Sequence, residues 1–164
     1  MTFGILIWLF VLATALHNFE EALWLPTWSL RAGRWHSVVS SSQFRGAVIV
    51  LTLFAALCAF LARVGGKGSV GAYLVTGYAL TMLLNVLAPH VTASLVMRRY
   101  MPGTATALLF NLPATLLLLR AAFVEHQIEM GVFLWAGPLV VLSILVSIPV
   151  LFYLFRNDVG RSSS

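Results

Sequence analysis

Long apolar stretches alternate with short polar or glycine-containing segments along this chain. The apolar stretches cover residues 3–25, 46–63, 70–97, 104–123 and 131–155. A helix needs about 20 apolar residues to cross the hydrocarbon layer of a membrane, and each stretch is close to that length or longer. The pattern therefore predicts an all-α bundle of about five transmembrane helices in one domain over residues 1–156, followed by a polar tail over residues 157–164.

Composition separates the chain from ordinary soluble proteins. Of its 164 residues, 60% are hydrophobic and 9% are charged, whereas about 25% are charged in a typical soluble domain. Ten Lys and Arg stand against five Asp and Glu, but they form neither a basic run nor a basic helical face. We therefore expect no nucleic-acid partner. In a membrane protein such an excess is typical of cytoplasmic loops beside anionic lipid, so membrane lipid is the expected partner.

The basic residues also predict an orientation. With five spans, three of them fall on one side of the membrane: Arg63, Lys67 and Arg120. Seven fall on the other side: Arg31, Arg34, Arg45, Arg98, Arg99, Arg156 and Arg161. Because loops rich in Lys and Arg stay in the cytoplasm, we expect the N-terminus outside and the C-terminus in the cytoplasm.

The first apolar stretch contains ionisable residues, in the sequence His-Asn-Phe-Glu-Glu at positions 17–21. Ionisable groups inside a transmembrane helix are rare, costly and usually functional. Helical spacing places His17, Glu20 and Glu21 on one side of the helix, while Asn18 turns away from them. No Lys or Arg lies near these carboxylates within a span, so they need a metal ion, protonation or water at the helix end.

The third stretch is interrupted by Asn85, Pro89 and His90. Proline has no N–H to donate to the carbonyl four residues earlier, so we expect a kink there. At a rise of about 1.5 Å per residue, His90 lies at the same membrane depth as His17, on the cytoplasmic side of the centre. Asn85 and Asn111 lie nearer the midplane on the same side.

The connecting segments are expected to be irregular. Pro26 is predicted to end the first helix, and residues 37–43 to form no regular structure. His36 is expected at the membrane interface. Glu125 and His126 are expected in a solvated loop, about one membrane thickness from the cluster in the first span.

A metal site is one chemical interpretation of this cluster. His17 and Glu21 have the i, i+4 spacing that helical zinc motifs use, and His90 adds a second imidazole. This set suits zinc with an open position, or ferrous iron. Glu20 would then act as general base for a metal-bound water, and two amides would contact substrate or orient ligands, those of Asn85 and Asn111.

Other interpretations of the cluster remain open. A polar cluster can join helices by hydrogen bonds alone, and glutamates near a helix end can be solvated. A proton-coupled transporter of small molecules and a non-catalytic membrane partner are the alternative functions. The chain is short for a transporter and has no evident inverted repeat, although an oligomer could supply one.

Several short motifs together resemble one family, the HXXEE family of bacterial multi-pass membrane proteins. The resemblance covers residues 13–113 and is carried by His17-Asn18-Phe19-Glu20-Glu21, Leu25-Pro26, Asn85, Pro89-His90, Tyr100-x-Pro102-Gly103-Thr104 and Asn111-Leu112-Pro113. It implies that the ionisable residues of the first span and His90 belong to one site, and it implies no substrate. We expect a bacterial inner-membrane protein with a metal-assisted or acid–base site near the cytoplasmic leaflet. Its reaction would be hydrolysis or group transfer on a lipid or another apolar small molecule.

Overall fold

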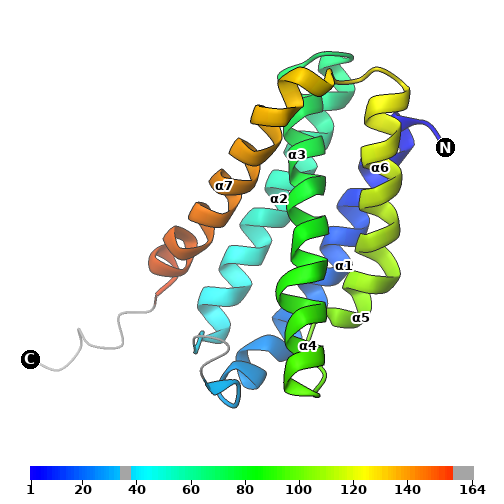
Figure 1. Cartoon of the computed structure of the whole chain (residues 1–164). Helices are drawn as coiled ribbons and strands as arrows, with labels where there is room; N and C mark the ends of the chain where they lie inside the picture. Colours follow the sequence, from blue (N-terminus) through cyan, green and yellow to red (C-terminus); the bar gives the residue numbers. More distant parts are fainter. Residues whose placement is uncertain (34–37, 157–164) are drawn as a thin grey trace, which may run out of the picture.

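A computed structural model describes residues 1–33 and 38–156, and these residues form a bundle of α-helices (Figure 1). The elements are α1 (Phe3–Ser29), α2 (Ser41–Gly65), α3 (Val70–Asn85), η2 (Val86–Val91), α4 (Thr92–Met97), α5 (Thr104–Thr106), η3 (Ala107–Asn111), α6 (Leu112–Val124) and α7 (Met130–Leu154), of which η2 and η3 are π-helical. The described part holds five helical segments long and apolar enough to cross a membrane. The five predicted spans are thus confirmed as helices, whereas the predicted tail at 157–164 and His36 lie outside the described residues.

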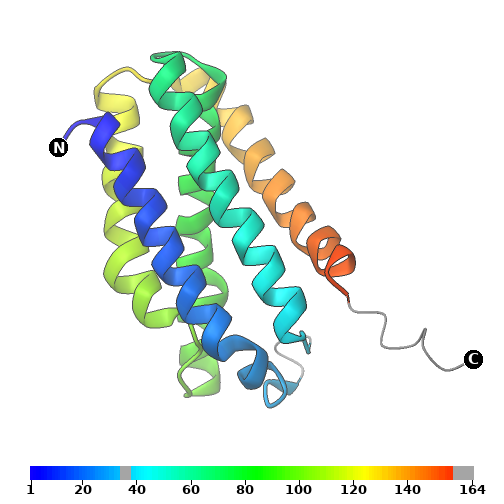
Figure 2. The same ribbon diagram turned by 180° about the vertical axis from the view of Figure 1, so that it is seen from behind.

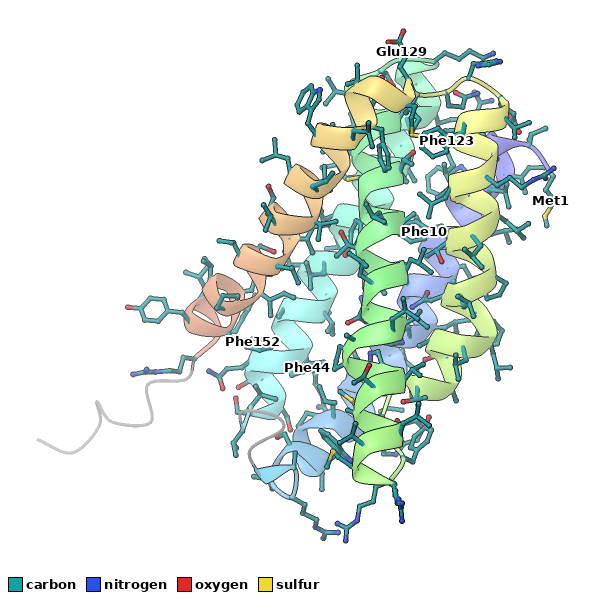
Figure 3. All side chains as sticks on the ribbon, viewed as in Figure 1. Met1, Phe10, Phe44, Phe123, Glu129 and Phe152 are labelled. Carbon is teal, nitrogen blue, oxygen red and sulfur yellow. The ribbon has the colours of Figure 1, made fainter. Side chains whose placement is uncertain are left out.

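Helices α1, α2, α3 and α6 form the body of the bundle, and α7 packs on the outside against α2 and α3 (Figures 1 and 2). The α2–α3 turn and the α6–α7 link lie at the same end as the N-terminus. The α4–α5 turn lies at the opposite end, beside the end of α1. Figure 3 shows Phe10 in the middle of the bundle, where its ring is fully buried.

Small residues allow α2 and α3 to approach closely. A Cβ atom on Gly71 would lie 2.3 Å from the backbone nitrogen of Ala62, so only glycine fits at this crossing. Alanines of both helices are also fully buried, including Ala55, Ala59 and Ala79. In lipid, close packing of this kind is a main source of helix association, because burial of apolar surface offers little gain there.

The structure corrects the predicted boundaries of the segment that connects the first two spans. Pro26 lies inside α1, which continues to Ser29. Proline leaves the carbonyl of the residue four positions earlier without its helical donor, and here that carbonyl, of Ala22, accepts a hydrogen bond from Nε of Arg45 at 3.4 Å. Residues 37–43 are also not wholly irregular, because α2 begins at Ser41 behind a complete capping box.

Glu125 differs from the solvated loop residue that the sequence predicted. Its Oε1 accepts a hydrogen bond from the backbone N–H of Phe3 at 2.9 Å, and thereby satisfies one of the free donors at the start of α1. Its neighbour His126 is exposed, as expected. The carboxylate therefore ties α6 to α1 at the end of the bundle farthest from the α4–α5 turn.

Candidate metal centre

The third span breaks where the sequence predicted a kink. Ala88 leaves the helical region, with φ −137° and ψ 118°, and the surrounding η2 segment is π-helical. The ring of Pro89 disfavours the helical conformation for the residue before it and removes one backbone donor. Such local π-helical segments are frequent at functional sites. The break brings the imidazole of His90 against that of His17, with ring centroids 4.7 Å apart and planes at 87°.

Three side chains from α1 and η2 converge at this break. Nε2 of His17 lies 3.6 Å from one oxygen of Glu21, and Nε2 of His90 lies 3.3 Å from the other. All three ligand atoms lie within 4.8 Å of one another. Both imidazoles are fully buried, while 12% of the Glu21 side chain is exposed. We refer to His17, Glu21 and His90 as the His/Glu cluster.

The spacing within the cluster suits a metal ion. Ligands about 2.1 Å from a tetrahedral metal lie about 3.4 Å from one another. The two nitrogen–oxygen distances of the cluster, 3.6 and 3.3 Å, are near that value but involve different oxygens of Glu21. One ligand atom from each residue lies within 4.8 Å of the others, so the side chains would move closer together around an ion. The structure thus brings together the residues that the sequence predicted as metal ligands, and their role as ligands stays a prediction.

The contacts of His17 indicate which ring nitrogen carries the proton. Its Nδ1 lies 3.2 Å from the carbonyl oxygen of Gly103 and 3.1 Å from the hydroxyl of Thr106. Because the carbonyl can only accept, we assign the proton to Nδ1. In the neutral ring Nε2 is then an acceptor, and Asn85 donates to it from Nδ2 at 3.2 Å. The carboxylate of Glu21, which also only accepts, faces the same nitrogen. A metal ion or a proton between this nitrogen and the carboxylate would bind both acceptors.

Glu20 points to the turn between α4 and α5 instead of to the His/Glu cluster. Its Oε1 accepts hydrogen bonds from the Tyr100 hydroxyl and from the Gly103 N–H at 2.9 Å. Its Oε2 accepts from the N–H and the hydroxyl of Thr106 at 3.1 and 2.6 Å. These contacts favour a holding role over the general-base role that the sequence predicted, which stays untested.

Gly103 lies directly against the cluster. A Cβ atom on this residue would lie 2.6 Å from Cε1 of His90, 2.9 Å from Cγ of Glu21 and 2.9 Å from Cε1 of His17. Its φ of +92° is in the left-handed region that glycine adopts readily. The turn can therefore cover the three side chains only because glycine occupies this position.

Sequence reasoning did not assign a role to Tyr100, Gly103 or Thr106. The signal available was the Tyr-x-Pro-Gly-Thr run of residues 100–104, which looks like an ordinary turn between two spans. Burial and the hydrogen bond to Glu20 raise the pKa of the Tyr100 hydroxyl, while the N–H of Ala105 lowers it by donating to the same oxygen. The hydroxyl is therefore held as a donor to the carboxylate.

The amides predicted beside the cluster have different surroundings. Asn85 contacts His17, as described above. Asn18 turns away from the cluster, as predicted, and donates to the Thr52 hydroxyl of α2 at 2.8 Å. Asn111 is fully buried, and its amide has no hydrogen-bond partner among the described residues. Its predicted contact with substrate or ligands stays a prediction.

Comparison with known proteins gives a family and a relative. The family described as "Protein of unknown function with HXXEE motif" matches residues 8–118 of this chain. The "Uncharacterized protein YrkK" of Bacillus subtilis (strain 168) is 35% identical over 143 residues, which cover 87% of this chain and 90% of that protein. No solved structure matches the chain.

Proposed function

The chain belongs to the HXXEE family, and we propose that it is a membrane protein that binds a divalent metal ion through His17, Glu21 and His90. The observation that carries this proposal is the convergence of two imidazole nitrogens and a carboxylate within 4.8 Å. Two histidines with one carboxylate form a ligand set that zinc and ferrous iron both use.

The hydrogen-bond environment of the two proposed histidine ligands supports this proposal. Ligating histidines commonly donate their other ring N–H to a carbonyl or carboxylate, which fixes the tautomer and the ring orientation. His17 has this arrangement with the Gly103 carbonyl. His90 is fully buried, yet neither ring nitrogen has a regular hydrogen bond within the described part of the chain. A buried imidazole without hydrogen bonds is costly, and coordination would use one of its nitrogens.

Glu20 has a positioning role in this proposal. Four hydrogen bonds join it to the turn at residues 100–106, and that turn supplies the carbonyl that orients His17. The two adjacent glutamates thus have different roles: Glu21 is a metal ligand, and Glu20 holds the turn that covers the metal site. Asn85 lies where it can donate to a bound ligand once a metal occupies Nε2 of His17.

The reaction we propose is hydrolysis or group transfer on a lipid or another apolar small molecule. A metal with three protein ligands keeps open positions, where it polarises a substrate oxygen or lowers the pKa of a bound water.

The site would lie near the cytoplasmic leaflet of the bacterial inner membrane. The Lys and Arg count supports that orientation, because Arg98 and Arg99 follow the third span at the end of the bundle nearer the cluster.

Metal analysis of the purified protein tests the proposal. The protein should contain close to one zinc or iron per chain, and H17A and H90A should each lose most of it. The matched control is H126A, because His126 is exposed in the link before α7 and should keep the metal. Equal metal content in all variants, or none in the unmodified protein after reloading, would reject metal binding. The cluster would then be a group of ionisable side chains that pack together without a metal ion.

A further inference from the structure

A cavity of about 460 Å³ lies between α7 and the pair α2 and α3. Its volume falls in the range of about 300–1,000 Å³ that is usual for small-molecule sites. The lining is mainly aliphatic and aromatic, with Leu25 and Phe44 on one side and Ile144 and Ile148 on the other. Most of its surface is therefore suited to a hydrocarbon group.

The polar end of this cavity adjoins the His/Glu cluster. Glu21 and Asn85 both line it. Glu21 belongs to the cluster, and Asn85 donates to its His17. A molecule inside the cavity would thus have its apolar part between the helices and its polar part beside the proposed metal.

The shape of the cavity follows from the tilt of α7. In the first half of α7, a Cβ atom on Gly77 would lie 2.7 Å from Cβ of Val140, so α3 and α7 are in close contact there. Farther along, α7 leans away from α3 (Figure 1). On the α2 side, the rings of Phe44 and Phe152 lie 6.1 Å apart, and Gln43 donates to the Phe152 carbonyl at 3.1 Å (Figure 3).

The α3 side of the cavity opens toward the membrane. Leucines from α3, η2 and α7 line it and are also exposed on the outer surface: Leu84, Leu87 and Leu145 are 45%, 54% and 52% exposed. These residues belong to helices long and apolar enough to span a bilayer. An apolar molecule would therefore enter sideways from the lipid, without crossing water.

Charge restricts what the polar end accepts. Glu21 is the one formally charged residue among the described residues that line the cavity, and no Lys or Arg lines it. When the metal is absent, a carboxylate or phosphate headgroup at this end would face the carboxylate of Glu21 with no cation nearby. The repulsion between two negative charges is costly at low dielectric. The metal-free cavity therefore favours an uncharged polar group, such as a hydroxyl or an ester.

We propose that this cavity binds the chain of an uncharged single-chain amphiphile, with its polar group at Glu21 and Asn85. This inference rests on the proposed function for the chemistry that follows binding, but the binding itself can be measured without metal. It names the class of molecule that the metal-free cavity takes: a neutral, lipid-like molecule that reaches the cluster from within the bilayer.

The test uses metal-stripped full-length protein in nanodiscs and a photoreactive analogue of hexadecanol. Crosslinks should map to the lining of α3 and α7, and unlabelled hexadecanol should compete at least about tenfold better than palmitate. E21Q should remove most of that preference, because the amide no longer repels the carboxylate. Crosslinks elsewhere in the wild-type protein, or equal competition by palmitate, would overturn the proposal.

A pair of variants on α7 tests the position of the chain. I148W places an indole ring at a half-buried position that lines the cavity. L142W makes a similar change at a residue that is 59% exposed and does not line the cavity. I148W should weaken hexadecanol binding by about tenfold, and L142W should leave it unchanged. Equal hexadecanol binding by both variants would contradict the proposal. If I148W does not fold, the positions of the crosslinks in the wild-type protein test the proposal instead. If the protein does not bind hexadecanol in this cavity, its metal content is not affected. The proposals of amphiphile binding and of metal binding can therefore be rejected independently.

Discussion

The Nδ1–H of His17 donates to the backbone carbonyl of Gly103, 3.2 Å away and 86 residues later in the chain. With the proton on Nδ1, Nε2 accepts from the Asn85 amide at 3.2 Å and faces Glu21. The bond to Gly103 also makes the orientation of His17 depend on the turn that Glu20 holds. The turn and the His/Glu cluster are therefore one structural unit.

Replacement of Gly103 by alanine should damage the cluster directly. The added Cβ would overlap His90, Glu21 and His17, so G103A should reduce metal affinity by about 10–100-fold, as loss of an orienting partner typically does. The measurement is a metal titration with a competing chelator. The matched control is G66A, because Gly66 also has a positive φ, +71°, but has nothing within 4 Å of the added Cβ. Equal loss of affinity in both variants would show that backbone strain, not the contact with the cluster, is responsible.

The two adjacent glutamates should respond differently to the same substitution. An amide in place of Glu20 has one acceptor oxygen for four donors, so E20Q should lower the free energy of unfolding by roughly 1–3 kcal/mol. E21Q should leave stability nearly unchanged and reduce metal affinity. Melting temperature and metal content of both variants, measured together, check this. An unchanged melting temperature for E20Q, with metal retained and activity lost, would favour the general-base role for Glu20 instead.

Alkaline pH should weaken the turn through Tyr100. Its pKa is raised in the folded protein, by burial and by its hydrogen bond to Glu20, so the folded state keeps the phenol proton to higher pH than the unfolded chain does. The resulting stabilisation is complete below the ordinary tyrosine pKa of about 10 and is lost as the pH rises through the folded value. The difference in melting temperature between wild type and Y100F should therefore be constant at neutral pH and shrink above about pH 10. A difference that is independent of pH across this range would contradict the assignment.

The orientation of the bundle can be checked with terminal reporters. The excess of Lys and Arg at the end that carries Arg98 and Arg99 predicts a cytoplasmic C-terminus. A C-terminal alkaline phosphatase fusion should be inactive, and a C-terminal fluorescent protein should be bright. An active phosphatase fusion would place the His/Glu cluster near the outer leaflet and would reverse the side on which the proposed reaction takes place.

Much of the fold was predictable from sequence because a bilayer imposes simple length and polarity rules. Apolar stretches of membrane length identify the five helices, and the missing N–H of Pro89 identifies the break in the third one. Similar depth in two adjoining spans was enough to pair His90 with His17. Boundaries were less predictable, since α1 continues past Pro26 once Arg45 of α2 donates to the freed carbonyl.

The division between Glu20 and Glu21 was decided by the tertiary structure. Adjacent residues point about 100° apart on a helix, so the sequence places both near His17 without choosing between them. The choice depends on what packs on each side of α1: His90 faces Glu21, and the donors of Tyr100, Gly103 and Thr106 face Glu20. The same holds for the cavity, which exists because α7 leans away from α3, a relation between helices that no local pattern encodes. Sequence alone determined which groups are ionisable inside the membrane, and helix packing determined what each of them contacts.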